Sequence, residues 1–354
     1  MKTISRVISS AVMLLISALL CAAAWKLPQL IAPWYTGLSA NVLSVIGAVT
    51  AVFPFPLWEA IAVLLIVWAV ASLIHDLKKK KPLRWVTGVL WGASFAVLLF
   101  VVLWGAGHFL PTKTEQIVSV RAPSEDRLAN AAAYYGNRAS ALANLVPRDE
   151  EGMLSADDLT ELSRASDGGF AALAAQYDCI EDTEVTVKPL LPGDLFSYAG
   201  TTGIFVAYTA EPCFNPNTYG FAMPFTICHE RAHRLGANTE ADANFIAYLA
   251  CASSSDLRYR YSGEFSAFMY CYNALYKLSP ERAAEVWNAS LSAQVQQDLL
   301  GATEHYAPYE GGVKDTAQQV NDLYLKAFAQ SEGVGAYEKV SDALAAWYAE
   351  QIAG

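Results

Sequence analysis

The stretch PFTICHERAHRLGANTEADANFIAYLAC, residues 224–251, decides how the second half of this 354-residue chain is organised. When its first part is placed on a helix, His229 and His233 project from one face, one turn apart. We expect Gly236 to end this helix and Thr239 to cap a second one. The stretch therefore predicts a tight helical hairpin.

The two histidines have the spacing of a metal site. Residues four apart on a helix can bring their Nε2 atoms to one tetrahedral ion. Glu230 points about a third of a turn away, so it is poorly placed as a ligand but well placed as a base for a metal-activated water. The sequence HERAH thus predicts zinc bound by His229 and His233, with Glu230 as the general base.

The hairpin also offers a third ligand. Glu240 falls in the first turn of the second helix, from where its carboxylate can reach the ion beside His233. Asp242 is the second choice, because it lies about two-thirds of a turn further on and should point elsewhere. Asn244 follows Glu240 by one turn and is placed to hydrogen-bond a metal ligand.

Composition and charge divide the chain near residue 110. Charged residues make up only 16% of the sequence and hydrophobic residues 54%, which is typical of a protein partly embedded in lipid. Residues 1–110 carry a net charge of +6 and residues 111–354 a net charge of −16. We therefore expect a membrane anchor followed by a separate domain. The acidic second part excludes nucleic acid as a partner, since nucleic-acid binding needs a basic surface.

Three segments are predicted to cross the lipid bilayer, at about residues 7–25, 57–74 and 85–110. The first has an alternative interpretation as a cleaved signal peptide, since Ala-rich residues follow its apolar core. Residues 27–56 are apolar but contain several prolines and glycines. They are interpreted as an interfacial or re-entrant stretch, with a fourth span as the alternative.

Two clusters of basic residues set the expected orientation. Short loops rich in Lys and Arg stay in the cytoplasm, and the clusters are Lys2 and Arg6 at the N-terminus and Lys78, Lys79, Lys80, Lys81 and Arg84 between the second and third segments. With three spans, residues 111–354 then lie outside the cytoplasmic membrane.

The later domain is expected to be mainly α-helical with one small sheet. Residues 124 to about 145 have a helical pattern opened by a capping Ser124, and helical character returns from residue 224 almost to the end. Residues 183–216 are rich in Val, Thr, Tyr and Phe punctuated by Pro and Gly, which predicts short strands. Five of the six cysteines lie in this domain, where disulfide pairs are an open alternative to free thiols.

The HERAH pattern occurs in zinc peptidases. Besides the metal and the base, such an enzyme needs a group that stabilises the oxyanion of the transition state. Tyr261, Tyr324 and His305 are candidates, and Tyr324 is preferred, with Asn321 one turn earlier to position it. Packed aromatic side chains with structural hydrogen bonds are the alternative for each. Glu211 is predicted to lie on an edge strand that binds substrate, or else to be a turn carboxylate.

The motif resembles that of known zinc peptidases. The sequence resembles the gluzincin arrangement, in which the third zinc ligand is a glutamate on a following helix: it has His229-Glu230-x-x-His233 and then Glu240-x-x-Ala243-Asn244. Similar patterns occur in membrane-embedded CAAX-type and HtpX-like peptidases and in ImmA/IrrE-like peptidases. Over most of its length the chain resembles a bacterial membrane family known as domain of unknown function 3810. The resemblance implies a zinc-peptidase-like fold in the cytoplasmic membrane and supplies no substrate. It is carried by the Pro-Phe-Pro segment 54–56 and by residues 188–215, 224–251, 261–276 and 320–340.

Two arginines depart from the zinc-peptidase pattern. Arg231 and Arg234 occupy positions that are normally uncharged, and we expect them on a solvated back face of the helix. The leading hypothesis is a membrane-anchored zinc peptidase acting on peptides or proteins. The alternatives are an inactive zinc-binding pseudo-peptidase that serves as a sensor or scaffold, and a membrane protein in which Glu230 only pairs with Arg234.

Overall fold

The computed structural model describes residues 2–150, 152–154, 158–328 and 336–352. By its internal contacts the chain divides into two compact units. The N-terminal unit comprises residues 1–111 together with Val206–Glu211, and the C-terminal unit comprises residues 112–205 and 212–354. The segment Val206–Glu211, which the sequence analysis assigned to the later domain, thus packs with the N-terminal helices.

The N-terminal unit is helical. Among the described residues, four of its helices are long and apolar enough to cross a membrane: α1 (Lys2–Lys26), α2 (Pro28–Thr50), α3 (Leu57–Lys78) and α4 (Pro82–Leu103). The 3₁₀ helix η1 (Gly105–Phe109) follows, so the last apolar helix ends earlier than the predicted residue 110.

Helix α2 corrects the interpretation of residues 27–56 as a stretch broken by proline and glycine. It runs without interruption through Pro33 and begins with Pro28 in its first turn. Proline suits the first turn, where the backbone N–H has no helical partner, and apolar helices tolerate an internal proline when neighbouring helices surround it. Two of its side chains reach the end of α4, where the Tyr35 and Ser39 hydroxyls donate to the carbonyls of Val101 and Leu103.

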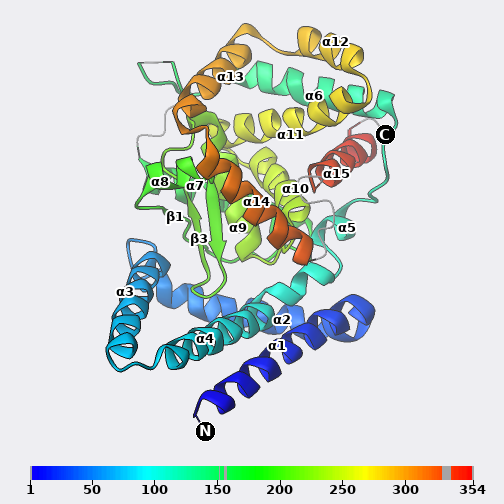
Figure 1. Ribbon diagram of the computed structural model, residues 1–354. Coiled ribbons are helices and arrows are strands. Elements are labelled where there is room, and N and C mark those ends of the chain that lie inside the picture. The colour runs from blue at the N-terminus through cyan, green and yellow to red at the C-terminus, as the bar shows by residue number, and fades with distance from the viewer. Residues whose placement is uncertain (1, 151, 155–157, 329–335, 353–354) are drawn as a thin grey trace. The chain divides into compact units, whose positions relative to one another are not determined.

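Helices α1 and α4 pack against each other with their first turns at the same end (Figure 1). The Arg6 guanidinium donates to the carbonyl oxygen of Arg84 at 3.0 Å. The two helices therefore run in the same direction, and the basic N-terminus lies beside the basic loop between α3 and α4.

The N-terminus of α3 is capped from far along the sequence. Pro56 precedes this helix and provides no side-chain cap. Instead the carboxylate of Glu211 accepts hydrogen bonds from the backbone N–H groups of Leu57 and Trp58, at 2.8 and 2.9 Å. Glu211 is only 1% exposed. A buried carboxylate at a helix N-terminus satisfies otherwise unpaired donors and interacts favourably with the helix dipole.

The C-terminal unit is mainly helical with one small sheet, as predicted. The strands β1 (Lys188–Pro189), β2 (Gly203–Val206) and β3 (Glu211–Phe214) are ordered β1-β3-β2, with β1 parallel to β3 and β2 at an edge. The helices are α5 (Lys113–Ile117), α6 (Glu125–Ala143), α7 (Leu159–Gln176), α8 (Gly193–Tyr198), η2 (Gly220–Ala222), α9 (Met223–Arg234), α10 (Glu240–Ser253), α11 (Leu257–Leu278), α12 (Pro280–Ser290), α13 (Ala293–Tyr306), η3 (Ala307–Tyr309), α14 (Gly312–Ala327) and α15 (Ala336–Gln351).

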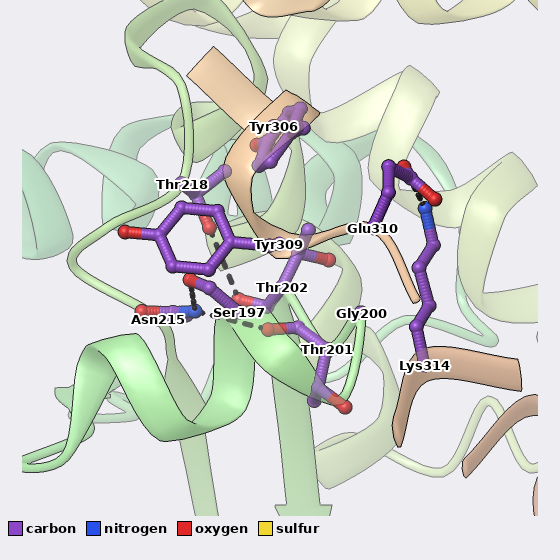
Figure 2. Close-up of a pocket in the computed structure, with 10 residues that line it drawn as sticks. All are labelled: Ser197, Gly200, Thr201, Thr202, Asn215, Thr218, Tyr306, Tyr309, Glu310 and Lys314. Carbon is purple, nitrogen blue, oxygen red and sulfur yellow. Dashed lines mark hydrogen bonds and ion pairs between the residues drawn. The ribbon is translucent and has the colours of Figure 1, made fainter. Parts of the chain in front are cut away.

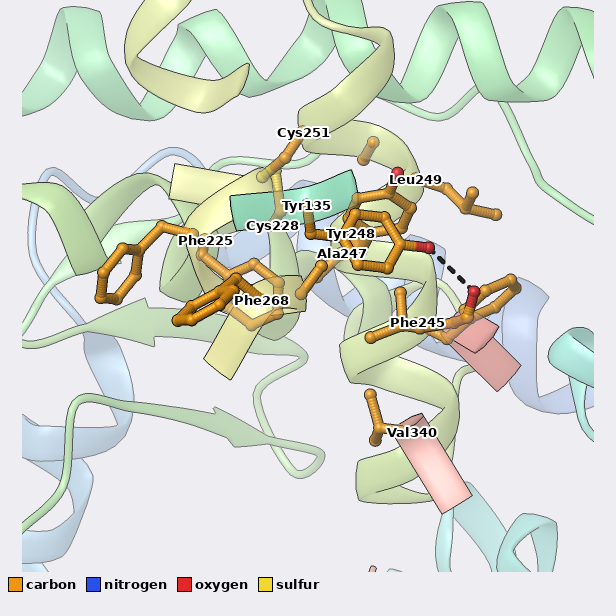
Figure 3. Close-up of a cluster of buried hydrophobic side chains, with 14 of the residues drawn as sticks. Tyr135, Phe225, Cys228, Phe245, Ala247, Tyr248, Leu249, Cys251, Phe268 and Val340 are labelled. Carbon is orange, nitrogen blue, oxygen red and sulfur yellow. Dashed lines mark hydrogen bonds between the residues drawn. The ribbon is translucent and has the colours of Figure 1, made fainter. Parts of the chain in front are cut away.

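The core of this unit surrounds α10, which is buried along most of its length. Figure 3 shows Tyr248 of α10 beside Tyr135 of α6, with Phe225 and Cys228 of α9 and Phe268 of α11 in the same cluster. Helix α7 approaches α10 closely at Gly169, where an added Cβ would lie 2.3 Å from the carbonyl oxygen of Ala250. All six cysteines of the chain are free thiols in this structure, so it forms none of the disulfides left open by the sequence.

The Glu211 cap is tested by Glu211→Gln. The amide removes the charge and one acceptor from a buried site, so we expect the free energy of unfolding to fall by about 1–3 kcal/mol. Thermal unfolding of the full chain in detergent measures this loss. The matched control is Glu184→Gln, an exposed carboxylate, which should leave the midpoint unchanged. Equal midpoints for the two variants would show that the cap contributes nothing.

Candidate metal centre

The predicted helical hairpin is present. Helix α9 ends at Arg234, and Gly236 adopts a left-handed conformation with φ of +91° that reverses the chain. The side chain of Thr239 then accepts a hydrogen bond from the backbone N–H of Asp242 and caps α10. Both helix ends are therefore fixed by local sequence, and Glu240 enters at the first position of α10.

The hairpin brings His229, His233 and Glu240 together. One ligand atom from each lies within 4.8 Å of the others, a group that could hold a metal ion. The Glu240 carboxylate lies 3.4 Å from Nε2 of His229 and 3.5 Å from Nε2 of His233. Two ligand atoms on a tetrahedral zinc ion, at bond lengths of about 2.0–2.2 Å, are about 3.3–3.6 Å apart. Both distances from the Glu240 carboxylate, one to each of its oxygens, fall in this range, so the three side chains are close enough to share one ion.

Both imidazoles are oriented by their other nitrogen. Nδ1 of His229 lies 2.8 Å from Oδ1 of Asn244, and Nδ1 of His233 lies 2.7 Å from the carbonyl oxygen of Ala237. An acceptor at Nδ1 holds one proton there, so Nε2 is the nitrogen that faces the Glu240 carboxylate, and loss of the Nε2 proton would leave a lone pair for a metal ion. Asn244 thus occupies the place that the sequence predicts for it, and the turn itself supplies the second acceptor.

The electrostatics of the group favour a cation at its centre. Burial acts to lower the pKa of His233, but the hydrogen bond and charge of Glu240 raise it to about 9. Burial acts to raise the pKa of Glu240, yet hydrogen bonds from His229 and His233 hold it well below its usual range. The carboxylate therefore stays ionised and attracts positive charge into the space between the imidazoles.

Glu230 lies beside this group and is almost completely buried, at 5% exposure. Burial raises its pKa to about 7, against the opposing effect of the two imidazoles. Its Oε2 atom has no hydrogen-bond partner among the described residues. A buried carboxylate oxygen without a partner is costly, so such an atom indicates a bound water or ligand group that completes it.

Strand β2 touches Glu230 at its first residue. A Cβ added to Gly203 would lie 2.5 Å from Oε1 of Glu230 and 2.8 Å from Cγ2 of Thr226. Only glycine permits this approach. Sequence reasoning overlooked Gly203, although glycine at the start of a strand is a known signal of close backbone contact.

The expectation of a solvated back face for the two arginines is wrong. Arg231 is 1% exposed and Arg234 is 6% exposed. The Arg231 guanidinium is paired with the carboxylate of Asp167, donates to the carbonyl oxygen of Thr183 at 3.0 Å and lies 4.8 Å from the ring centroid of Phe170. Because α7 covers this side of α9, the arginine is neutralised within the fold rather than by solvent.

Arg234 is compensated differently. Burial lowers the pKa of its guanidinium, and the charge of Glu181 opposes that effect. The acids that compensate the two arginines are thus Asp167 for Arg231 and Glu181 for Arg234.

Asp242 points away from the histidines. Its carboxylate accepts from the backbone N–H and hydroxyl of Thr114, at 2.8 and 2.7 Å, and from the backbone N–H of Lys113 at 3.2 Å. These bonds cap α5 and occupy both oxygens. Glu240 is therefore the carboxylate available to a metal, as the helical spacing indicated.

Two of the three oxyanion candidates hold structural hydrogen bonds. The Tyr261 hydroxyl is buried and bonded to Asp298. Nε2 of His305 lies 2.7 Å from the carbonyl oxygen of Asn217. Both side chains therefore fit the structural alternative.

Tyr324 and Glu211 are not members of the metal-ligand group. Tyr324 lies on α14 with a partly exposed side chain, and its ring contacts Phe328 at 5.3 Å between centroids. Its role as an oxyanion donor stays a prediction. Glu211 lies on β3, which is the central strand of the sheet, so the prediction of an edge strand is wrong. Its carboxylate is used by the α3 cap, which gives its predicted role in substrate binding no support.

The family of the chain follows from a sequence comparison. A family model described as protein of unknown function (DUF3810) matches residues 34–345. The chain belongs to the DUF3810 family. The match includes the His229, His233 and Glu240 group and runs from the second turn of α2 into α15, although residues 329–335 within it lie outside the described residues. No curated protein and no solved structure matches the chain.

The donor set of this DUF3810 protein is tested by Glu240→Gln and Asp242→Asn, two acids on one turn of α10. The purified full chain should hold about one metal ion. Glu240→Gln should lose it and Asp242→Asn should keep it, as measured by elemental mass spectrometry. Asn244→Ala should weaken metal affinity by about 10–100-fold, because His229 loses its orienting acceptor. Metal retained in Glu240→Gln, or lost only in Asp242→Asn, would contradict the assignment.

Proposed function

We propose that this DUF3810 protein is a membrane-anchored zinc peptidase of gluzincin type. The observation that carries the proposal is the unpartnered, buried Oε2 of Glu230 beside a ready-made His229, His233 and Glu240 group. Two histidines and a carboxylate also suit iron(II) in some enzymes. A buried carboxylate next to the ligands, free to accept a proton, favours hydrolysis with zinc instead.

Each residue of the site has a separate role in the proposed hydrolysis. When bound, zinc would supply Lewis acidity and lower the pKa of a water molecule. Glu230 accepts the proton of the attacking water at Oε2 and is suited to this by a pKa near 7. Asn244 and the carbonyl of Ala237 hold the imidazoles in place. Strand β2, at the edge of the sheet and in contact with Glu230, is positioned to pair with an extended peptide.

The competing functions lose part of their support. The scaffold hypothesis relied on two uncompensated arginines, but Arg231 is paired with Asp167. The hypothesis of an incidental histidine pair needed an ion pair between Glu230 and Arg234, and the described residues form none. The inactive zinc protein remains the alternative, and only a test of turnover separates it from the peptidase.

We infer a location outside the cytoplasm for the C-terminal unit. If all four apolar helices crossed the membrane in turn, α1 and α4 would run in opposite directions, yet the Arg6 contact places their first turns together. Three crossings by α1, α3 and α4 agree with the parallel pair, with α2 remaining on the far side. The basic loop Lys78–Lys81 then faces the cytoplasm beside the N-terminus, and α4 leads outward.

The base is tested by Glu230→Gln. This variant should retain its metal, since Glu230 is not a ligand, and should lose at least about 10²–10³-fold in turnover. The full chain in detergent is incubated with denatured casein and new amino termini are counted. Cleavage by the wild type but not by Glu230→Gln supports the peptidase. A wild type that binds zinc and cleaves nothing would favour the inactive scaffold.

The contact between β2 and the base is tested by Gly203→Ala. The added methyl would overlap Oε1 of Glu230, so the base must shift and turnover should fall about tenfold or more. Metal content should not change, because the ligands are untouched. The control is Gly168→Ala on α7, where an added Cβ meets nothing within 4 Å. Unchanged turnover in Gly203→Ala would show that the close approach has no functional consequence.

A further inference from the structure

Six cationic side chains gather at one end of the N-terminal unit. The Arg6 contact brings the first turns of α1 and α4 together there, and the loop between α3 and α4 leads directly into α4 (Figure 1). All of these side chains are exposed except that of Arg6, which is half-buried. This basic cluster consists of Arg6, Lys78, Lys79, Lys80, Lys81 and Arg84.

The basic cluster carries more positive charge than its surroundings balance. Asp76 is the carboxylate beside it, with Oδ1 4.0 Å from Nε of Arg84, and among the described residues none of the four lysines forms an ion pair. Together the six cations and Asp76 carry a net charge of +5. Several cations of the C-terminal unit, by contrast, have a carboxylate partner, as Figure 2 shows for Lys314 and Glu310. Like charges held this close repel one another, so the cluster favours an anionic partner.

The basic cluster lies where two apolar helices end. Helix α3 ends at Lys78 and α4 begins at Pro82, and both helices are long and apolar enough to cross a bilayer. Leu77 and Leu83, which flank the lysines, are 53% and 64% exposed. Trp85 follows in the first turn of α4, and tryptophan is enriched where membrane meets water. These features indicate that the cluster lies at the depth of the lipid headgroups.

Arg6 is held in place on α4 with most of its donors available. Its Nη1 atom donates to the carbonyl oxygen of Arg84 at 3.0 Å, and a Cβ added to Gly88 would lie 3.4 Å from the same atom. The absence of a side chain at Gly88 therefore leaves room for the guanidinium. This hydrogen bond uses one of five N–H donors, and the planar group suits two-pronged binding of a phosphate.

We propose that the basic cluster is a binding site for the phosphate groups of anionic phospholipids. Groups of about four to eight Lys and Arg beside a membrane-crossing helix are suited to such headgroups. A zwitterionic headgroup carries its own cation, which the cluster repels, so the site selects net negative charge. Leu77 and Leu83 favour a lipid over a free anion, because acyl chains cover their exposed apolar surface. The inference is independent of the metal centre and of the side of the membrane on which the cluster lies.

The test measures lipid binding to the purified full chain in neutral detergent. Native mass spectrometry counts the lipids bound during titration with phosphatidylglycerol, which is anionic, and with phosphatidylcholine, which is zwitterionic. We expect phosphatidylglycerol to bind the wild type at least about tenfold more tightly. One cation near an anionic surface strengthens attachment about fivefold, so Lys79→Gln should weaken phosphatidylglycerol binding about fivefold, and Lys79→Gln with Lys80→Gly about 25-fold.

The variants are chosen so that loss of binding is separable from loss of the fold. Lys80 has a φ of +54°, a left-handed conformation that glycine adopts readily, so Lys80→Gly removes a charge without weakening the turn. The matched control is Lys26→Gln, an exposed cation at the other end of α1 whose Nζ lies 3.6 Å from the ring centroid of Trp25. It should leave phosphatidylglycerol binding unchanged, and thermal midpoints in neutral detergent show that each variant is folded.

Three outcomes of the titrations would overturn the inference. The first is equal binding of the two lipids by the wild type. The second is an equal loss of phosphatidylglycerol binding in Lys26→Gln and Lys79→Gln. The third is unchanged binding in folded Lys79→Gln with Lys80→Gly.

Inorganic phosphate separates a lipid headgroup from a free anion. Added to the lipid-free chain, it should bind far more weakly than phosphatidylglycerol, and equally tight binding would contradict the assignment to a lipid. Washing the lipid-loaded chain at about 1 M ionic strength, where charges are screened beyond about 3 Å, should release phosphatidylglycerol. Retention that salt does not affect would show that the acyl chains alone hold the lipid, against the inference.

Discussion

The position of Glu240 between two imidazoles is the constraint on which the rest of the site depends. A carboxylate that lies 3.4 and 3.5 Å from the two Nε2 atoms brings three potential metal ligands together inside the fold. The hairpin maintains it, because Gly236 turns the chain and Ala237 in the same turn holds His233. One short turn therefore both reverses the chain and orients a ligand, and a change in its conformation would separate the donors.

The other charged groups near His229, His233 and Glu240 have partners of their own, and none of them pairs with Oε2 of Glu230 among the described residues. Asp242 caps α5, Arg231 is paired with Asp167, and both Nδ1 atoms of the histidine pair have acceptors. One carboxylate oxygen of Glu230 has no partner among the described residues, as the proposed role of Glu230 requires. Strand β2 approaches the same carboxylate at Gly203, so Glu230 and this edge strand are in direct contact.

The sequence predicts the parts of the site that are local along the chain. His229, His233, Glu240 and Asn244 span sixteen positions on two consecutive helices, so helical spacing alone places them. The family match and the mainly helical fold with a small sheet agree with what the motifs indicated.

Long-range contacts explain what the sequence could not show. Arg231 meets Asp167 across 64 positions, and Glu211 caps α3 across more than 150, distances at which no periodicity carries information. The sequence predicted that Arg231 is exposed to solvent, because most charged residues are. In the structure it is buried, since α7 packs over it and supplies Asp167 as its partner. Likewise the prolines of α2 indicated a broken segment, whereas an apolar helix accommodates them.

The central claim is that His229, His233 and Glu240 bind zinc in one site. X-ray absorption at the zinc edge, measured on the purified full chain, reports the ligand atoms directly. The account predicts two imidazole nitrogens and carboxylate or water oxygens at about 2.0–2.2 Å, and in His229→Ala either loss of the zinc or an imidazole contribution that falls from two nitrogens to one. A spectrum dominated by sulfur at about 2.3 Å, or an imidazole contribution that the substitution leaves unchanged, would contradict it.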